Sequence, residues 1–249
     1  MHHVNLLKRT EVAQGTFAFE FEKPAGFTFR AGQFGEWKIP NPPYTDAEGN
    51  QRAFSFASAP SDDTLMLATR MRDTAFKNSL KEIPLGTEIE LDGPFGSMTL
   101  LNSAAKPLVF LAGGIGIAPF RSMIRCAAHE KLSHRIFLFY SNRRVEDAAF
   151  LTELNNLQRK IPTPERGRDS DLDADSRLGR RRRSVGATNF KLFATMTEPE
   201  KSARPWAGER GFISIGLLKR HLDNLQLPLY YIAGPPTFAA AMWQMLKLS

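Results

Sequence analysis

The stretch from residue 107 to residue 121, PLVFLAGGIGIAPFR, decides the fold of this chain. It begins with an uninterrupted apolar run at 108–111, which is typical of a strand buried on both faces. Glycines follow at 113, 114 and 116, and a helical pattern runs from 120 to 129. This order favours a phosphate-binding site, because glycine lets the backbone approach an anion and the first N–H groups of a helix point toward it.

Apolar runs alternate with helical patterns after this turn, which predicts a parallel sheet with crossover helices. We expect its strands at 108–111, 136–140, 190–195 and 230–232. We expect its helices at 120–129, 148–158, 215–222 and 237–246.

Short strands separated by turns precede residue 102, and they predict a small antiparallel β-barrel. We expect its strands at 16–22, 34–39, 52–58, 64–71 and 88–91, with one short helix at 75–81. The sequence Asp92-Gly93-Pro94 predicts a turn that ends the last strand. The chain therefore divides into a barrel domain over 1–101 and a Rossmann-like parallel α/β domain over 102–249.

The composition is that of a soluble globular protein, with 42% hydrophobic and 24% charged residues among 249. Cys126 is the single cysteine, so we expect a packed thiol, no disulfide and a reducing compartment, the cytoplasm. The first residues show no signal peptide, and no apolar stretch is long enough to span a membrane. The net charge of +7 suits anionic cofactors or an acidic redox partner as well as nucleic acid.

A stretch rich in charges of both signs, 163–187, interrupts the second domain. Its few apolar residues cannot form a core, so we expect a disordered loop. It contains four consecutive arginines at 180–183. No aromatic residues are interleaved with them, which favours a solvated linker over a nucleic-acid site.

Four short motifs occur in order along the chain: RAFS at 52–55, GPFG at 93–96, GGIGIAPF at 113–120 and AGPP at 233–236. Each alone is a weak signal. Together, in this order and spacing, they resemble the ferredoxin–NADP reductase superfamily. That resemblance implies a flavin-binding antiparallel barrel followed by a nicotinamide-dinucleotide domain.

The resemblance assigns flavin-binding residues in the barrel. Arg52 is expected to bind the flavin phosphate, and Phe54 takes the place of the family's tyrosine against the isoalloxazine ring. Ser55 is expected to donate to flavin N5 and is our candidate catalytic residue. Arg70 lies on the next flavin-side strand, and Ser79 is the candidate where the family places a helix start against the phosphates.

The second domain carries the residues expected to bind the dinucleotide. Gly114, Gly116 and Pro119 are assigned to the pyrophosphate, and Thr197, Gly234 and Pro235 to the crevice that receives the nucleotide. Ser141, Arg143 and Arg144 follow the second strand, where a hydroxyl and two guanidiniums suit a 2′-phosphate. This pattern favours NADPH and leaves NADH open.

The leading interpretation is therefore a flavoprotein oxidoreductase that passes electrons from NAD(P)H through FAD to a protein or small-molecule acceptor, such as ferredoxin, flavodoxin or a partner oxygenase. FMN stays open, and the lack of a cysteine cluster predicts no metal centre. Two alternatives remain. One is a non-catalytic flavin-fold protein whose basic insert docks an acidic partner. The other is an electron-transfer subunit of a larger reductase.

The sequence ends directly after the predicted helix at 237–246. Members of the family continue into one more strand and often finish with an aromatic residue that shields the flavin. We therefore expect one open edge of the parallel sheet.

Overall fold

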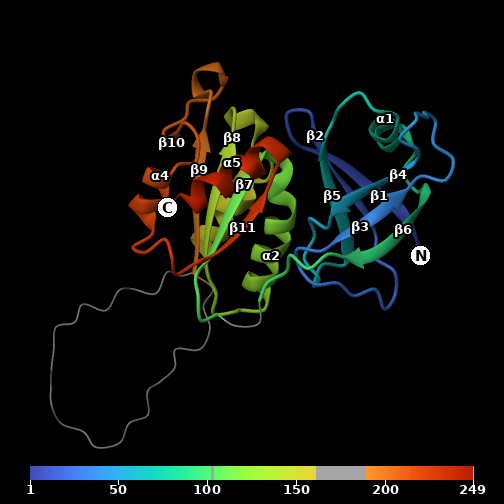
Figure 1. The fold of residues 1–249 in the computed structure, drawn as a ribbon. Coiled ribbons are helices and arrows are strands. Elements are labelled where there is room, and N and C mark those ends of the chain that lie inside the picture. The colour runs from blue at the N-terminus through green and yellow to red at the C-terminus, as the bar shows by residue number, and fades with distance from the viewer. Residues whose placement is uncertain (102–103, 161–188, 249) are drawn as a thin grey trace, which may run out of the picture.

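A computed structural model of the chain describes residues 1–101, 104–160 and 189–248, so the predicted loop at 163–187 lies outside the described residues. Two sheets stand side by side (Figure 1). One contains six antiparallel strands and the other five parallel strands. The predicted fold class, an antiparallel barrel followed by a Rossmann-like parallel α/β unit, is confirmed.

The antiparallel sheet has the order β4-β3-β6-β1-β2-β5. Its strands are β1 (His2–Ala13), β2 (Thr16–Glu22), β3 (Phe34–Lys38), β4 (Gln51–Ser55), β5 (Thr64–Arg70) and β6 (Glu88–Phe95). Directly after edge strand β4, the N–H of Ala57 donates to the carbonyl of Met66 in edge strand β5 at 2.7 Å. This bond joins the two edges and bends the sheet toward a closed barrel.

The barrel core is aromatic because alternate residues of each strand point inward. Phe19 and Phe21 of β2 are fully buried, and Phe21 packs on Trp37 with ring centroids 4.8 Å apart. Helix α1 (Ala75–Glu82) covers one end of this core with its buried residues Phe76 and Leu80. These contacts fix α1 beside strand β4.

Two features of the barrel differ from expectation. Strand β1 was not predicted, because its residues His2–Ala13 mix polar and apolar side chains without strict alternation. The predicted turn at Asp92–Pro94 is wrong, since β6 continues to Phe95 through a cis Gly93–Pro94 peptide bond. Pairing of β6 with both β1 and β3 outweighs the turn signal of a Gly-Pro pair.

The parallel sheet has the order β10-β9-β8-β7-β11. Its strands are β7 (Leu108–Gly113), β8 (Arg135–Asn142), β9 (Asn189–Met196), β10 (Glu209–Arg210) and β11 (Leu229–Ala233). Its helices are α2 (Ile117–His129), α3 (Leu151–Lys160), α4 (Ile215–His221) and α5 (Pro236–Lys247). Three elements differ most from expectation: α2 starts three residues earlier than predicted, α3 starts three residues later, and the short edge strand β10 was not predicted.

Strand β7 is buried along its whole length, as its apolar run predicts. Phe110 and its neighbours on one face join a core with α2 and α3. Val109 and Leu111 on the other face join a core with α4 and α5. The ring of Phe110 stacks on Phe120 of α2 with centroids 4.6 Å apart, which sets α2 directly against the sheet.

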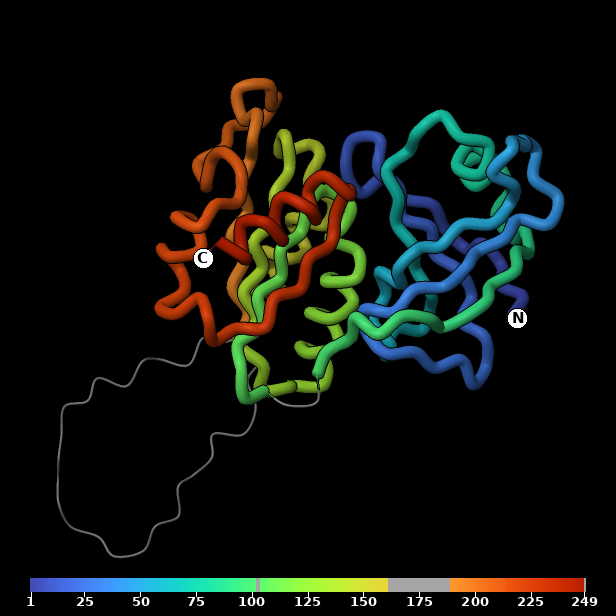
Figure 2. Tube along the Cα trace, viewed as in Figure 1, coloured from blue at the N-terminus to red at the C-terminus, as the bar shows by residue number. Residues whose placement is uncertain are grey.

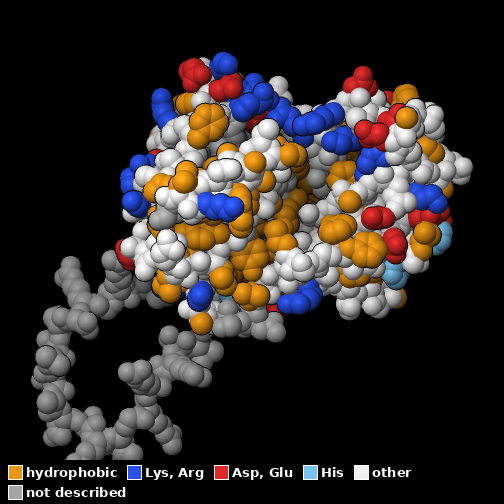
Figure 3. Space-filling model, in the orientation of Figure 1, with side chains coloured by type: hydrophobic (Ala, Val, Ile, Leu, Met, Phe, Trp, Pro, Cys, Tyr) orange, Lys and Arg blue, Asp and Glu red, His pale blue; other side chains and the backbone are white. Residues whose placement is uncertain are grey.

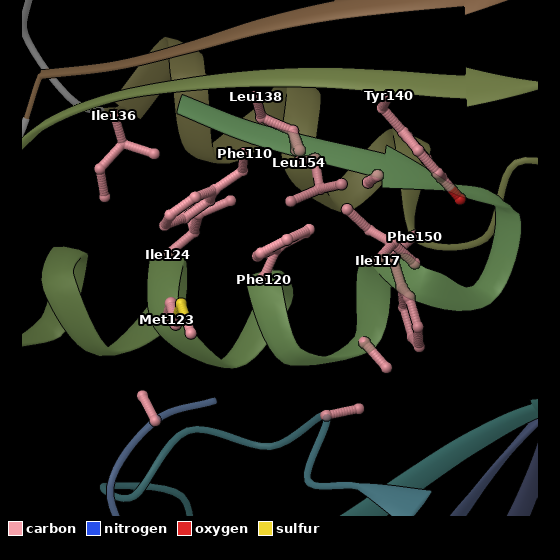
Figure 4. Close-up of a cluster of buried hydrophobic side chains, with 14 of the residues drawn as sticks. Phe110, Ile117, Phe120, Met123, Ile124, Ile136, Leu138, Tyr140, Phe150 and Leu154 are labelled. Atoms are coloured by element: carbon pink, nitrogen blue, oxygen red, sulfur yellow. The ribbon is translucent and has the colours of Figure 1, made fainter. Parts of the chain in front are cut away.

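Helix α2 lies between the two sheets (Figures 1 and 4). Its apolar face belongs to a core that also includes Ala57 and Ala68 of the barrel side. Its polar side chains bond the barrel backbone: Arg121 donates to the carbonyl of Ala57 at 2.5 Å, and Ser122 to that of Ser58 at 2.6 Å. One helix thus packs against both sheets and sets their separation.

A second connection lies at the tip of the β1–β2 hairpin, which reaches toward the parallel sheet (Figure 2). The N–H of Gln14 donates to the carbonyl of Glu146 at 2.8 Å. The guanidinium of Arg144 donates to the Gln14 side chain at 2.9 Å. Two sets of contacts therefore hold the two sheets together, one from α2 and one from the tip of the β1–β2 hairpin.

Candidate functional site

The glycine turn lies where β7 meets α2, through a short 3₁₀ turn, η1 (Gly114–Gly116). Gly114 has a φ of +52°, a conformation that other residues rarely adopt. A side chain at Gly116 would collide with the carbonyl oxygen of Ala233 at the end of β11. The turn thus requires glycine twice, once for its backbone angle and once for the close approach of β11.

Two further glycines meet the ring of Phe238 from α5. A Cβ at Gly113 or at Gly234 would lie 2.7 Å from that ring. The carboxyl ends of β7 and β11 therefore come together, and the ring of Phe238 packs on both of them. Pro119, in the first turn of α2, is buried. Its missing N–H costs nothing there, because the first N–H groups of a helix have no partner within it.

A cleft of about 340 Å³ opens at these carboxyl ends. Six of the predicted binding residues line it: Arg70, Gly114, Ser141, Arg143, Thr197 and Pro235. Five of these come from the parallel sheet and its turns and Arg70 comes from the barrel, which also contributes Thr16 to the lining. Ligands of open parallel sheets bind at this end of the strands, so the cleft is the candidate functional site.

The cleft also holds a buried carboxylate, Asp147, in the 3₁₀ turn η2 (Val145–Asp147). Its oxygens lie 2.9 and 3.1 Å from the guanidinium of Arg144, 3.8 Å from that of Arg143 and 3.9 Å from that of Arg70. Burial acts to raise the pKa of Asp147, but hydrogen bonds and charge from the three arginines outweigh it and lower that pKa. The guanidiniums of three arginines thus surround one buried carboxylate.

The two arginines that follow β8 have different surroundings. Arg143 lines the cleft with its side chain half exposed, and its ion pair with Asp147 is long, at 3.8 Å. Arg144 forms hydrogen bonds with Asp147 and Gln14 and lines a separate cavity of about 680 Å³. The structure therefore places Arg143 at the cleft and Arg144 at the contact between the sheets.

An apolar groove of about 520 Å³ continues from the cleft along α5. It shares Ser141, Phe212 and Phe238 with the cleft. Phe212 is 79% exposed, and the sequence analysis did not single it out. Figure 3 shows hydrophobic side chains gathered over the middle of this face, where Figure 1 places β11 and α5. The site thus combines a cationic end with an apolar end.

The predicted flavin residues of the barrel lie where β4, β5 and α1 meet. Phe54 packs on Phe76 of α1 with ring centroids 5.7 Å apart. Arg52 points to the same side, with its guanidinium 5.6 Å from the centre of the Phe76 ring. Ser55, at the end of β4, is half buried and opposite Phe34 in the sheet.

The guanidinium of Arg52 is already bonded by the loop that precedes it. It lies 2.7 Å from the carboxylate of Glu48 and 3.6 Å from that of Asp46, and it donates to three carbonyls between residues 48 and 51. The contact of Arg52 with a flavin phosphate, expected from the sequence, stays a prediction. In the structure the guanidinium is paired with the chain's own carboxylates, Asp46 and Glu48.

Ser79 is likewise bonded within the chain and fully buried. Its hydroxyl accepts from the N–H of Tyr44 at 3.1 Å and donates to the Tyr44 carbonyl at 3.2 Å. The sequence placed Ser79 at a helix start against the flavin phosphates, and that contact stays a prediction; in the structure its hydroxyl bonds to the backbone of Tyr44. These bonds fasten the 44–50 loop to the helix.

The described residues contain no helix that is both long and apolar enough to cross a membrane. Across 1–101, 104–160 and 189–248, no group of three His, Cys, Asp or Glu residues is arranged to hold a metal ion.

Comparisons with known proteins agree with this architecture. A family described as the oxidoreductase NAD-binding domain matches residues 110–180. The chain is 25% identical over 235 residues to the glycine betaine monooxygenase reductase subunit of Chromohalobacter salexigens, covering 93% of this chain and 56% of that protein. It is 31% identical over 142 residues to the propane 2-monooxygenase reductase component of Gordonia sp. (strain TY-5), covering 56% of this chain and 39% of the relative.

Solved structures share the fold over nearly the whole chain. A ferredoxin NADP+ reductase from Neisseria gonorrhoeae superposes with a TM-score of 0.71 at 21% identity, covering 99% of this chain and 90% of the other. A cytochrome P450 reductase from Amycolatopsis gives a TM-score of 0.75 at 19% identity, covering 99% and 66%. The chain spans about half the length of the curated relatives that it matches.

Proposed function

We propose that the chain is a member of the ferredoxin–NADP reductase superfamily of oxidoreductases, and that it takes electrons from NAD(P)H through a bound FAD and passes them to a protein acceptor. The observation that carries this proposal is the cleft to which both sheets contribute. Arg70 of the barrel faces the glycine turn of the parallel sheet across it. A ligand in this cleft touches both halves of the molecule, as hydride transfer between two cofactors requires.

The residues of the cleft fit a dinucleotide. Gly114 and the first turn of α2 offer backbone N–H groups to a pyrophosphate, and the positive end of the helix dipole adds to that attraction. Arg70 and Arg143 add charge from two sides. Gly234 and Pro235 would let a flat ring pass close to the backbone at the end of β11.

We propose NADPH as the preferred nucleotide. Arg143 is half exposed at the cleft beside Ser141 and Thr197, and this group suits a doubly charged 2′-phosphate. The N–H of Thr197 donates to the carbonyl of Asn142 at 2.9 Å, so both strand ends are held in place. NADH lacks the group that Arg143 would bind.

In the barrel, we assign Phe54 to the flat face of the flavin and Ser55 to a hydrogen bond with its N5 nitrogen. A bound flavin supplies the hydride acceptor and the one-electron chemistry. The chain supplies position and electrostatics. Phe54 is held by Phe76, and its carbonyl accepts from the Trp37 indole at 3.4 Å, so its ring has little freedom.

We propose that the barrel, 1–101, is the flavin-binding unit and that 102–249 is the nucleotide-binding unit. The relatives named above are reductase subunits or components of monooxygenases. A partner oxygenase or its ferredoxin is therefore our proposed acceptor. Because this chain matches about half of each relative's length, the electron-transfer-subunit interpretation is part of the same proposal.

The test uses the purified protein reconstituted with FAD. Flavin absorbance reports binding, and anaerobic addition of NADPH or NADH reports reduction. Steady-state rates with an artificial acceptor then compare the two nucleotides. We expect bleaching with both and a higher kcat/KM with NADPH. A flavin that stays oxidised with both nucleotides contradicts the proposal.

A further inference from the structure

Three cations gather at the start of α1, near the residues assigned to the flavin. They are Arg52 of β4, Arg72 just after β5 and Lys77 in the first turn of α1. The ammonium of Lys77 donates to the carbonyl of Arg70 at 2.7 Å, which fixes it at the end of β5. Like charges brought together at a half-buried position destabilise one another unless an anion joins them.

The three cations differ in what neutralises them. Arg52 has two carboxylates, Asp46 and Glu48, and three carbonyls as partners. No carboxylate of the described residues forms an ion pair with Lys77 or Arg72. The pKa of Lys77 is lowered, mainly by burial and then by the positive charges of Arg72 and Arg52. No carboxylate of the described residues acts to raise this pKa. Unneutralised charge therefore lies on Lys77 and Arg72.

Asp46 has a second contact that matters here. Its other oxygen accepts from the N–H of Ala75, the first residue of α1, at 3.1 Å. One carboxylate thus bridges Arg52 and the helix start, where the motif alone would place a phosphate. With Ser79 bonded to Tyr44 and both terminal nitrogens of Arg52 bonded to the 46–51 loop, neither residue is turned toward an outside anion as the motif would place it.

We propose that Lys77, with Arg72 beside it, binds the phosphate of the flavin, and that Arg52 instead holds the 46–51 loop against the barrel. This inference rests on the proposed function and changes which residues carry it. An ammonium with three donors can hold a phosphate as a point charge while one N–H stays on the Arg70 carbonyl. The anion would join two cations that otherwise repel each other.

The test measures flavin binding by the apoprotein, using quenching of flavin fluorescence. The ligands are FAD, FMN and riboflavin, of which riboflavin lacks a phosphate. Lys77→Met keeps much of the apolar stem and removes the charge, and Lys77→Arg restores the charge. Lys81→Met, one turn further along the exposed side of α1, is the matched control.

We expect Lys77→Met to weaken FAD and FMN binding about tenfold or more, the usual effect of losing a charge-assisted hydrogen bond. Riboflavin binding stays unchanged, Lys77→Arg keeps most of the affinity, and Lys81→Met behaves as wild type. The salt dependence of FAD binding falls with Lys77→Met. Circular dichroism and the Tm check that each variant is folded.

Three results would overturn the inference. One is unchanged FAD affinity in Lys77→Met. Another is a loss of riboflavin affinity in Lys77→Met that equals the loss of FAD affinity, because it would assign Lys77 a structural role. The third is a phosphate-dependent loss in Arg52→Met with none in Lys77→Met. If wild type binds none of the three flavins, the proposed function itself fails, so the two failures are distinguishable.

Discussion

The carboxylate of Asp147 lies 3.9 Å from the guanidinium of Arg70, and the two residues belong to different sheets. Asp147 is buried in the turn after β8, whereas Arg70 is the last residue of β5. The distance is too long for a hydrogen bond, so charge orients Arg70, and within the described part of the chain its guanidinium has no hydrogen-bond acceptor. A barrel residue is thus presented to the cleft of the parallel sheet.

Arg70→Ala is expected to raise the KM for NADPH about tenfold and to leave kcat and flavin content almost unchanged. The reason is that Arg70 lines the cleft and has donors free for a phosphate of the dinucleotide. Steady-state kinetics and the flavin spectrum are the measurements. Arg70→Lys should recover part of the affinity, and loss of flavin in the alanine variant would contradict the assignment.

Two neighbouring substitutions are expected to have different effects. Arg143→Ala should change the preference between NADPH and NADH, whereas Arg144→Ala should change the stability of the fold. Loss of Arg143 should lower kcat/KM for NADPH about tenfold and leave that for NADH nearly the same. Loss of Arg144 should lower the free energy of unfolding, because it bonds both Asp147 and Gln14 and its removal leaves the buried Asp147 carboxylate without these hydrogen bonds. Urea unfolding and kinetics with both nucleotides give the two results. An Arg143 variant that loses both nucleotides equally speaks against a 2′-phosphate contact.

Gly116→Ala is expected to destabilise the protein by about 1–3 kcal/mol and to weaken dinucleotide binding, because its new methyl group meets the Ala233 carbonyl. Gly216→Ala in α4 is the matched control. Its Cβ has open space, with the nearest atom 3.7 Å away, so it should be neutral or stabilising by about 1 kcal/mol. Thermal unfolding compares the two. Equal Tm changes in both variants would contradict the proposed clash.

Acid is expected to weaken the contact between the sheets. The pKa of Asp147 lies below its usual range in the folded protein, so its contribution to stability is present above the unfolded-state pKa of about 3.9. That contribution is lost as the pH falls through the folded-state pKa. Urea unfolding at pH 6 and pH 3 should therefore show a smaller pH effect for Asp147→Asn than for wild type. An identical pH effect in both proteins would falsify this role.

Cys126 is expected to resist thiol reagents in the folded protein. Burial, with a smaller effect of Glu130, raises the pKa of its thiol to about 12, and its exposed fraction is 7%. Very little reactive thiolate therefore exists at pH 8. A coloured disulfide reagent should react slowly in buffer and fully in urea. Rapid reaction of the native protein is the contrary outcome.

Much of the fold could be predicted because its signals are local. The apolar run of β7 and the glycines after it specify a buried strand and a turn that no other residues satisfy. The Thr16–Glu22 strand was predicted with its observed bounds from simple alternation. By contrast, β1 lacks such a pattern, and its pairing with β2 and β6 depends on residues far along the chain.

The cleft was predicted better than the barrel site for the same physical reason. Ser141, Arg143 and Thr197 meet because parallel strands end at one edge, which topology alone dictates. The partners of Arg52 and Ser79 depend on how the 44–51 loop folds back on α1. No short motif encodes that contact, so Lys77 was not singled out from the sequence.

The bonds from Arg121 and Ser122 of α2 to the carbonyls of Ala57 and Ser58 bear on how this molecule turns over. Each bond joins helix α2 of the parallel-sheet unit to the backbone of the barrel. A hinge motion between these two units would have to break both hydrogen bonds. The relative position of the two sheets is then fixed before any ligand binds, and the ligands move in and out of the cleft. If the chain has the proposed activity, we expect nucleotide binding and release, rather than hinge motion between the two sheets, to set its turnover rate.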